Sequence, residues 1–301
     1  MDDSPPRAGF VAVIGAPNVG KSTLVNRLTG TKVSIVSPKV QTTRTRVLGI
    51  RVAGNTQIAF VDTPGLFRPR RRLDRAMIAA AWGGADAADR LLLLVDAARG
   101  IDADTEAIVA RLKETGRSNV ILALNKVDIA QKPKLLALAE RLNRAGIFSD
   151  VFMISAENGD GVDDLLAALA AAMPEGPWLF PEDQVSDMPE RMLAAEITRE
   201  QLYRQLQQEL PYRATVETES WRERDDGSVR IEQIIYVERE SQRSIVLGKG
   251  GGRIKSIGQA ARVELERILE RRTHLFLFVK VREKWEEDPE RYRALGLDFD
   301  V

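Results

Sequence analysis

The chain contains no cysteine and a single histidine, His274, and these two shortages exclude several kinds of site. Without cysteine there is no disulfide framework, no thiolate zinc site and no cysteine nucleophile. One imidazole cannot build a multi-histidine metal site, and we expect His274, which has no evident partner in the sequence, to be structural or exposed. The chemistry of this chain therefore has to come from other side chains and from the backbone.

The chain also lacks an excess of charge of either sign and any long hydrophobic run. Its 44 basic and 44 acidic side chains cancel, which argues against a global attraction to nucleic acid but leaves local patches open. Its apolar stretches, such as residues 10–16 and 91–95, are much shorter than the roughly 18 residues that span a bilayer. The start, MDDSPPRAG, has acids and prolines where a signal peptide has basic residues and an apolar run. We therefore expect a cytoplasmic protein.

The first half of the chain has the pattern of a sheet that is covered by helices on both faces. Near-continuous apolar runs alternate with amphipathic stretches, which predicts an α/β fold with a mostly parallel, doubly wound sheet. The runs cover residues 10–15, 46–53, 57–62, 91–96, 120–125 and 150–155. The second and third runs are joined by only Gly54-Asn55 and its neighbours, so they can form only an antiparallel hairpin.

The second half has a different texture. Residues 173–190 carry four prolines without a period and are interpreted as a linker. After it the pattern predicts a small α+β domain of order α-β-β-α-α-β. Its elements are an amphipathic helix over 190–210, strands over 212–223 and 229–239, a short helix, a glycine-rich turn at 248–252, a long helix to Arg272 and a strand over 274–281. We expect a first domain over 8–173, a linker over 174–190, a second domain over 191–285 and a tail over 286–301.

The strongest motif is GAPNVGKS at residues 15–22, directly after the first predicted strand and at the start of a helix. This is the G-x-x-x-x-G-K-[ST] phosphate loop in its required strand–turn–helix context. Its glycines let backbone N–H groups point inward, and these amides form, with the helix N-terminus, a cradle for phosphate oxygens. Lys21 then places an ammonium on the β- and γ-phosphates, and Ser22 offers a hydroxyl to Mg²⁺.

Two more segments supply metal and γ-phosphate contacts. DTPG at residues 62–65 ends a strand, where Asp62 can hold Mg²⁺ through water and the Gly65 amide can meet the γ-phosphate. QTTRTR at residues 41–46 lies where a switch segment should supply a threonine to Mg²⁺. We choose Thr43 for this role, with Thr42 next.

Two later strand ends predict the choice of base. In NKVD, residues 125–128, the Asp128 carboxylate can accept hydrogen bonds from N1–H and the exocyclic amine of guanine. Adenine offers an acceptor at N1 and no amine at C2, so this pairing selects GTP over ATP. Asn125 would brace the loops, the stem of Lys126 would lie along the base, and backbone amides near Ala156 in SAE, residues 155–157, would donate to guanine O6.

All five segments meet at one edge of the predicted sheet, and together they predict a nucleotide site. The predicted nucleotide-binding residues are Gly15, Ala16, Pro17, Asn18, Val19, Gly20, Lys21, Ser22, Thr23, Asp62, Thr63, Pro64, Gly65, Asn125, Lys126, Asp128, Ser155 and Ala156. Among the predicted residues, catalysis is assigned to Lys21, Thr43, Asp62, Gly65 and Asn18, and the metal to Ser22, Thr43 and Asp62.

GKGG at residues 248–251 has the G-x-x-G form of a KH loop and lies between two predicted helices. Such glycines let the backbone approach a nucleic-acid backbone and clamp about four nucleotides, so we expect single-stranded RNA. From residue 243 through 263 there are basic side chains and no acidic one, which is a local electrostatic footprint. The apolar residues Ile254, Ile257, Ala261, Leu265 and Ile268 recur at helical steps and are predicted core. The predicted RNA contacts are Arg243, Gly248, Lys249, Gly250, Gly251, Arg253 and Lys255.

Taken together these segments resemble the Era GTPase family. GAPNVGKSTLVN, QTTRTRVLGI, DTPGL, NKVD, the linker PEGPW-x-x-PEDQ-x-SD and IVLGKGGGRIKSIGQAAR match it in order, from about residue 10 to 285. The resemblance implies a GTPase domain joined to a type II KH domain that binds small-subunit ribosomal RNA near its 3′ end. It also implies a role in maturation of the small (30S) ribosomal subunit and peripheral contact with the inner membrane face. We expect a monomer.

Hydrolysis is expected to be slow because Leu66 follows DTPG, where many GTPases carry a water-orienting glutamine. A leucine neither donates nor accepts a hydrogen bond. Asn18 is the residue that in related GTPases helps to bind K⁺, so K⁺ is a second expected cation beside Mg²⁺. Between the β- and γ-phosphates it would replace an arginine finger.

Two other functions remain open from the sequence. The chain could be an RNA-binding assembly scaffold in which GTP is a structural ligand, or a signalling GTPase that acts through protein or membrane partners. The preferred interpretation is a GTP-hydrolysing switch whose nucleotide state controls how the KH domain engages ribosomal RNA. Its switch segments would be residues 34–46 and 63–75, ordered by a γ-phosphate.

Overall fold

The computed structural model describes residues 5–39, 42–117, 120–207 and 210–301. Residues 40 and 41 of the predicted switch segment therefore lie outside the described residues. The chain divides into two compact units, the first with residues 1–34, 43–187 and 295–301 and the second with residues 35–42 and 188–294. Each unit is described by itself.

The first unit is built on a six-stranded sheet of order β2-β3-β1-β4-β5-β6. The strands are β1 (Arg7–Ile14), β2 (Val47–Ala53), β3 (Thr56–Asp62), β4 (Arg90–Asp96), β5 (Val120–Asn125) and β6 (Phe148–Met153). Neighbouring strands pair in parallel except β2 and β3, which form an antiparallel hairpin. The predicted parallel sheet and its hairpin are confirmed.

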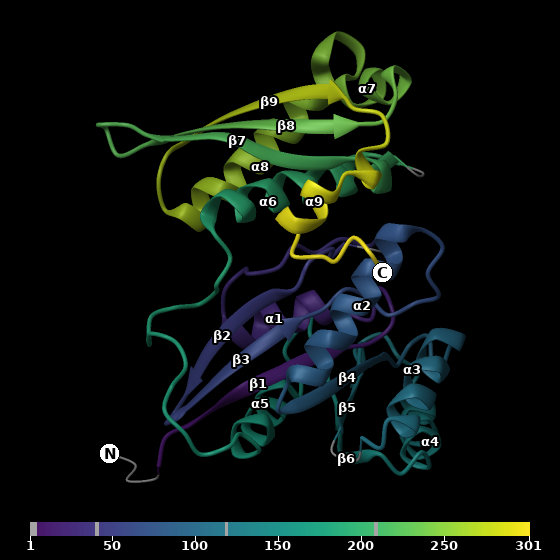
Figure 1. Cartoon of the computed structure of the whole chain (residues 1–301). Coiled ribbons are helices and arrows are strands. Elements are labelled where there is room, and N and C mark those ends of the chain that lie inside the picture. Colours follow the sequence, from purple (N-terminus) through teal and green to yellow (C-terminus); the bar gives the residue numbers. More distant parts are fainter. Residues whose placement is uncertain (1–4, 40–41, 118–119, 208–209) are drawn as a thin grey trace. The chain divides into compact units, whose positions relative to one another are not determined.

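Helices cover both faces of this sheet (Figure 1). They are α1 (Lys21–Thr29), α2 (Arg72–Ala87), α3 (Ala103–Glu114), α4 (Lys132–Asn143) and α5 (Val162–Ala171). Trp82 of α2 and Ile108 of α3 belong to the core cluster that they form with strand residues such as Leu93. Because β1, β3, β4 and β5 run in parallel, their carboxyl ends meet at one edge of the sheet.

The second unit has the predicted order α-β-β-α-α-β. Its main elements are α6 (Glu190–Gln205), β7 (Thr215–Glu223), β8 (Val229–Val237), α7 (Glu240–Leu247), α8 (Gly252–Leu269), β9 (Thr273–Val281) and α9 (Pro289–Ala294). Short 3₁₀ turns lie at Leu210–Arg213, Lys249–Gly251 and Trp285–Glu287. β8 pairs antiparallel with β7 and parallel with β9, and α6 and α8 pack on this sheet (Figure 1).

Three expectations about this unit are wrong in detail. The helix predicted to reach Leu210 ends at Gln205, and the helix predicted to reach Arg272 ends at Leu269, because Glu270 adopts a left-handed φ of 51°. The first helix is also not amphipathic, since it buries consecutive polar residues such as Arg199 and Glu200. Their charges are paired along the helix, Arg199 with Glu196 and Glu200 with Arg204, which lets the polar side be buried.

Some segments pack with a unit that is not their neighbour in the sequence. Residues 35–42 group with the second unit, where Ile35 joins the core formed by α6, α8 and β8. The proline-rich segment through Asp187 groups with the first unit. There the Gln57 side chain hydrogen-bonds to the backbone of Phe180, and Trp178 Nε1 donates to the Asn55 carbonyl at 3.2 Å.

Within the described ranges, no helix combines the length and the apolar character that crossing a membrane requires.

Candidate nucleotide and RNA sites

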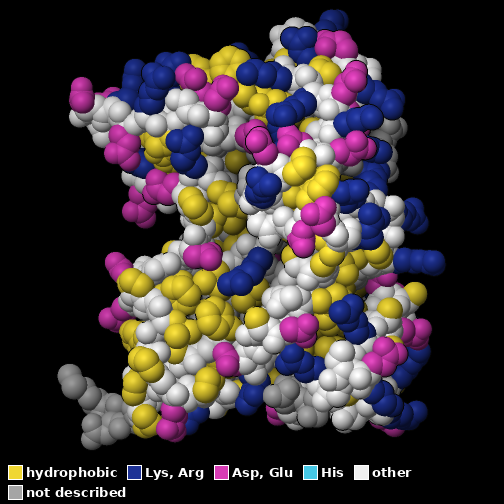
Figure 2. Space-filling model, in the orientation of Figure 1, with side chains coloured by type: hydrophobic (Ala, Val, Ile, Leu, Met, Phe, Trp, Pro, Cys, Tyr) yellow, Lys and Arg dark blue, Asp and Glu magenta, His cyan; other side chains and the backbone are white. Residues whose placement is uncertain are grey.

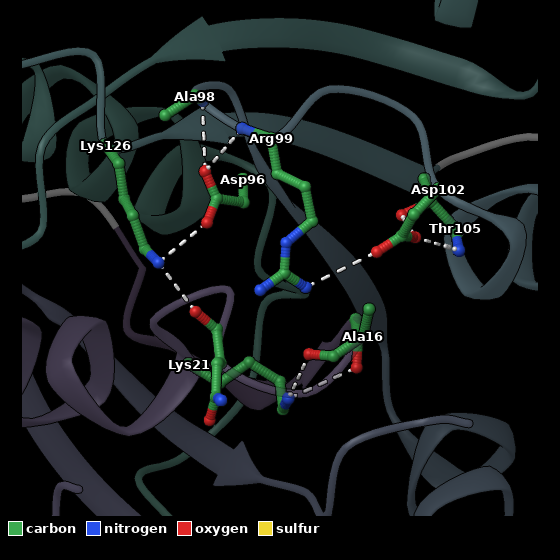
Figure 3. A network of polar contacts seen from close by, with 10 residues as sticks. Ala16, Lys21, Asp96, Ala98, Arg99, Asp102, Thr105 and Lys126 are labelled. Atoms are coloured by element: carbon green, nitrogen blue, oxygen red, sulfur yellow. Dashed lines mark hydrogen bonds and ion pairs between the residues drawn. The ribbon is translucent and has the colours of Figure 1, made fainter. Parts of the chain in front are cut away.

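The phosphate loop connects β1 to α1 through backbone conformations that glycine favours. Gly15 and Gly20 have φ of 151° and 101°, and a Cβ on Gly20 would collide with the Asn125 side chain. Lys21 Nζ curls onto the loop, 3.1 Å from the Gly15 carbonyl oxygen and 3.0 Å from that of Ala16 (Figure 3). Burial lowers the pKa of Lys21 from 10.5 to about 8, against the opposing charge of Asp62. A buried ammonium that is short of negative partners is suited to bind phosphate oxygens.

The three predicted metal ligands converge although they come from three separate segments. Ser22 Oγ lies 2.7 Å from Asp62 Oδ2 and 2.9 Å from Thr43 Oγ1, and Thr43 Oγ1 lies 3.3 Å from Asp62 Oδ2. Asp62 is fully buried, and burial raises the pKa of its carboxyl while the Ser22 hydroxyl and the Lys21 charge oppose this. In the described part of the chain, Asp62 Oδ1 has no hydrogen-bond partner. This cluster of hydroxyl and carboxylate oxygens has the chemistry that Mg²⁺ prefers.

The segment after β3 is tied to the phosphate loop. Thr63 Oγ1 donates to the Val13 carbonyl at 2.8 Å, and Leu66 N donates to the Gly15 carbonyl at 3.0 Å. A Cβ on Gly65 would lie 3.0 Å from Pro17 Cα, so only glycine fits there without a shift. The Leu66 side chain is buried in the core cluster, where it offers no group to orient water.

The predicted base-binding loops are braced by one side chain. Asn125 Nδ2 donates to the Val19 carbonyl at 2.8 Å, and its Oδ1 accepts from Ala156 N at 2.8 Å. The amide of Ala156 itself is therefore engaged with Asn125 in this structure. Asp128 is exposed, and none of the described residues donates a hydrogen bond to its carboxylate. Both of its oxygens are thus available to a ligand.

The remaining predicted residues of this site lie in the same loops or in the first turn of α1. They are Pro17, Asn18, Val19, Thr23, Pro64, Lys126 and Ser155. Asn18 and Lys126 share an unusual feature for residues other than glycine, a left-handed φ of 63° and 67°. The Lys126 ammonium donates to the Asn18 carbonyl at 2.7 Å, which joins the base loop to the phosphate loop (Figure 3).

Asp96, the last residue of β4, also lies at this site and was not among the predicted residues. Its carboxylate Oδ2 lies 2.7 Å from Lys126 Nζ (Figure 3). A signal was present in the sequence, because the run LLLLVD ends in a carboxylate at the same sheet edge as NKVD. Without knowledge of its contact with Lys126, however, this position of Asp96 indicated only the end of a buried strand.

The glycine-rich turn of the second unit has the backbone that its sequence predicts. Gly248, Gly250 and Gly251 have φ of 71°, 59° and 76°. A Cβ on Gly248 would lie 2.7 Å from Arg253 Cβ, whereas Gly250 faces open space. The loop therefore exposes backbone at the N-terminus of α8, where a nucleic-acid backbone can approach closely.

The basic side chains near this loop are mostly exposed. Lys249, Arg253 and Lys255 are exposed, and Arg253 Nη1 donates to the Ile245 carbonyl at 2.9 Å. Arg243 forms an ion pair with Glu240 at 2.7 Å, which partly offsets its charge. Lys and Arg side chains gather at the end of this unit that carries α7 (Figure 2). The apolar stripe predicted on α8 is confirmed as core, with Ile257 fully buried.

Two family models match the chain. One, described as a 50S ribosome-binding GTPase, matches residues 10–126, and a KH domain model matches residues 209–286. GTPase Era of Afipia carboxidovorans is 62% identical over 295 residues, covering 98% of this chain and 96% of the relative. GTPase Era of Brucella suis is 61% identical over 293 residues, covering 97% of this chain and 94% of the relative.

The chain belongs to the Era GTPase family.

Solved structures of Era agree with this fold over nearly the whole chain. Era in complex with MgGDPNP and nucleotides 1506–1542 of 16S ribosomal RNA matches with a TM-score of 0.92 at 39% identity, covering 98% of this chain and 100% of that one. A variant of Aquifex aeolicus Era bound to GDP and AlF₄⁻ matches with a TM-score of 0.91 at 38% identity and the same coverage. The predicted P-loop GTPase domain followed by a KH domain is confirmed, and this Era family member is a GTPase.

Proposed function

We propose that this protein is a GTP-hydrolysing switch that binds the 3′ region of small-subunit ribosomal RNA and assists maturation of the small (30S) ribosomal subunit. One observation carries the proposal. The chain combines a complete set of GTPase segments at one sheet edge with an exposed KH loop, and it matches over its length an Era that was solved with a GTP analogue and 16S ribosomal RNA.

Mg²⁺ and GTP are the expected ligands of the first site. The hydroxyls of Ser22 and Thr43 and the carboxylate of Asp62 would hold the metal. Asp62 Oδ1, which is buried and accepts no hydrogen bond from the residues that the structure describes, supports a further polar ligand there. When bound, Mg²⁺ would neutralise charge on the β- and γ-phosphates. Lys21 would add its ammonium, and the exposed Asp128 carboxylate would select guanine.

RNA binding is supported by the geometry around Gly250. The open backbone at Gly250 and Gly251, and the turn that Gly248 makes against Arg253, would contact the sugar-phosphate backbone. The side chains of Lys249, Arg253, Lys255 and Arg243 would supply positive charge. Binding of this kind weakens steeply with salt, because counterions are released when phosphates are neutralised. Salt-insensitive binding would contradict the proposal.

Control of RNA binding by the nucleotide is supported by the packing of residues 35–42. The Lys39 ammonium donates to the carbonyls of Tyr203 and Leu206 at the carboxyl end of α6, in the unit that holds the KH elements. In the sequence this segment directly precedes Thr43. Because Thr43 would be ordered by the metal of a bound triphosphate, the state of the nucleotide would alter the path of residues 35–42.

A potassium requirement for hydrolysis is a further proposal. Leu66 supplies no water-orienting group, and Asn18 lies in the phosphate loop with its backbone fixed by Lys126. We expect slow hydrolysis that is faster in KCl than in NaCl, and loss of that difference in Asn18→Ala. Equal rates in both salts would contradict the role of K⁺.

We also infer a cytoplasmic monomer, and peripheral contact with the inner membrane face stays a prediction. Cell fractionation in low and high salt would test the membrane contact, and sedimentation would test the monomer.

The decisive experiment is crosslinking of the full chain to RNA in cell extracts, once with a nonhydrolysable GTP analogue and once with GDP, followed by comparison of the two crosslink maps. We expect crosslinks at the 3′ end of small-subunit ribosomal RNA that depend on the analogue. Crosslinks elsewhere would contradict the RNA target, and identical maps would contradict the control by nucleotide.

The two open alternatives are separated by variants. A variant that binds GTP without hydrolysing it and still supports ribosome maturation would favour the assembly scaffold. Normal ribosome maturation with Gly250→Asp would favour the signalling GTPase.

A further inference from the structure

Asp96 lies at the same sheet edge as the base loop, although no motif includes it. It is the last residue of β4 and pairs in register with Asn125, the last residue of β5. The backbone continues this pairing, since Ala97 N donates to the Asn125 carbonyl at 2.8 Å. The position of the Asp96 carboxylate is thus set by two central strands of the sheet.

The two oxygens of Asp96 have separate partners. Oδ1 accepts from the backbone N–H groups of Ala98 and Arg99 at 3.0 and 3.1 Å, which fixes the turn after β4. Oδ2 accepts from Lys126 Nζ at 2.7 Å (Figure 3). The side chain of Asp96 is 8% exposed and that of Lys126 is 30% exposed, so water screens this ion pair only partly.

The Lys126 ammonium joins three loops. It contacts Asp96 after β4 and the Asn18 carbonyl of the phosphate loop, and its own backbone belongs to NKVD after β5. Asn18 and Lys126 both hold left-handed φ values, which residues other than glycine rarely adopt without support. The Lys126 ammonium, which holds the Asn18 carbonyl, would lose its ion pair if Asp96 were neutral.

We propose that Asp96 is a positioning residue for guanine-nucleotide binding, which anchors Lys126 so that its stem lies along the base and its ammonium holds the phosphate loop at Asn18. The inference rests on the proposed nucleotide site. Asp96 itself contacts neither base nor phosphate in this account. It acts by fixing the extended side chain of Lys126 before the nucleotide arrives, so the ordering of that side chain does not oppose binding.

The variant Asp96→Asn separates the ion pair from the turn. The amide oxygen can still accept from Ala98 and Arg99, while the amide nitrogen now faces the Lys126 ammonium and cannot accept from it. We expect GDP to bind about 10- to 100-fold more weakly, mainly through faster dissociation, because one charged hydrogen bond is lost. The melting temperature of the nucleotide-free protein should change little, since the turn is retained.

Asp102→Asn is the matched control. Asp102 Oδ1 accepts from Thr105 N at 2.8 Å and Oδ2 lies 3.5 Å from Arg99 Nη1, so this substitution also keeps a backbone contact and removes an ion pair. The contacts of the Asp102 carboxylate within the described ranges are with Arg99 and Thr105, and include neither Lys126 nor the phosphate loop. Its GDP affinity should equal that of the wild type, and an equal loss in both variants would overturn the assignment to Asp96.

A double-mutant cycle with Lys126→Met tests whether Asp96 acts through Lys126. If it does, Asp96→Asn should have almost no effect on GDP affinity in the Lys126→Met background. If Asp96→Asn lowered GDP affinity by the same factor in the wild-type and in the Lys126→Met background, the proposal would be overturned. A wild-type protein that fails to bind GDP would instead contradict the proposed nucleotide site, and loss in Lys126→Met with none in Asp96→Asn would contradict this inference alone.

Discussion

The nucleotide site and the KH loop differ in how far their ligand-binding groups are buried and held by other parts of the chain. In the first, Lys21, Asp62 and Asn125 are buried and hydrogen-bonded to other parts of the chain, so the site is held together by the protein itself. In the second, Gly250 and Lys249 are exposed, and the loop offers an accessible backbone and solvated charge. Buried polar groups need partners, whereas exposed charges do not. The difference predicts that a single substitution of a buried residue strongly lowers the nucleotide affinity of the first site. The RNA affinity of the second site should depend mainly on its net charge and on the salt concentration.

Lys21→Met should give the largest effect on the nucleotide site. Removing the buried ammonium leaves the phosphates without their principal charge, and we expect GDP affinity to fall roughly 100- to 1,000-fold. A fluorescence titration with labelled GDP measures this.

Lys249→Met is its counterpart in the KH loop and should leave GDP affinity unchanged while RNA affinity falls. If Lys21→Met bound GDP nearly as well as the wild type, the contrast between a pre-assembled and an open site would be wrong.

Gly250→Asp should reduce RNA affinity by about tenfold or more at low salt, because a carboxylate would face the phosphate backbone. Gly250 has a φ of 59° and open space around it, and aspartate tolerates this conformation better than most residues. The fold should therefore survive. Filter binding over a range of KCl concentrations measures the effect.

Gly250→Asn separates charge from shape, since asparagine adopts the same backbone without the negative charge. We expect a small loss that hardly changes with salt, while the additional loss in Gly250→Asp should shrink as salt rises. Equal losses in both variants at every salt concentration would show that shape, and not charge, governs this loop.

The affinity of the nucleotide site should depend on pH through Lys21, whose pKa is lowered from 10.5 to about 8 in the absence of ligand. A lysine whose folded pKa lies below its unfolded value destabilises the fold while it is charged. This cost is fully present below pH 8 and is relieved as the pH rises toward 10.5.

Phosphate binding needs the charged form, so it should weaken as the pH rises past about 8. We expect the ratio of GDP to GMP affinity, measured by calorimetry without Mg²⁺, to fall between roughly pH 7 and 9.5. Both ligands carry the same guanine, so deprotonation of the base affects both affinities equally and does not change their ratio. A ratio that is constant over this range would contradict the assigned role of the Lys21 charge.

Lys39→Met should give the smallest effect, a change of a few-fold in how strongly RNA affinity depends on the nucleotide. Its ammonium joins residues 35–42 to the carboxyl end of α6, and Met retains the apolar stem while removing the charge. Lys134→Met on the exposed face of α4 is the control and should leave the dependence unchanged. If the dependence of RNA affinity on the nucleotide were unchanged in Lys39→Met, residues 35–42 would not contribute to it through this contact.

The sequence predicted the nucleotide site better than the contacts that hold it. GAPNVGKS and NKVD are fixed in spacing because backbone amides and a carboxylate must meet one ligand, so the residues could be named from their pattern. Asp96 could not be assigned a partner, because its contact with Lys126 depends on which strands lie side by side. The order β1-β4-β5 follows from the whole sheet and not from any local run.

The same limit applies to α6 and to residues 35–42. A helix that carries Arg199 and Glu200 in succession has the pattern of a solvated surface. The pairing with Glu196 and Arg204, which lets these charges be buried, is visible only in the structure. Ile35 follows a G-domain helix in the sequence yet packs with α6 and α8. Contacts between segments this distant leave no periodic signal, so local reasoning assigns them to the wrong neighbours.

The most direct test of the account is the affinity of the full chain for single-stranded RNA from the 3′ end of small-subunit ribosomal RNA, measured with Mg²⁺ and either a nonhydrolysable GTP analogue or GDP. We expect tighter binding with the analogue, together with loss of that binding in Gly250→Asp. Equal affinities for both nucleotide states would contradict a switch that controls the KH domain.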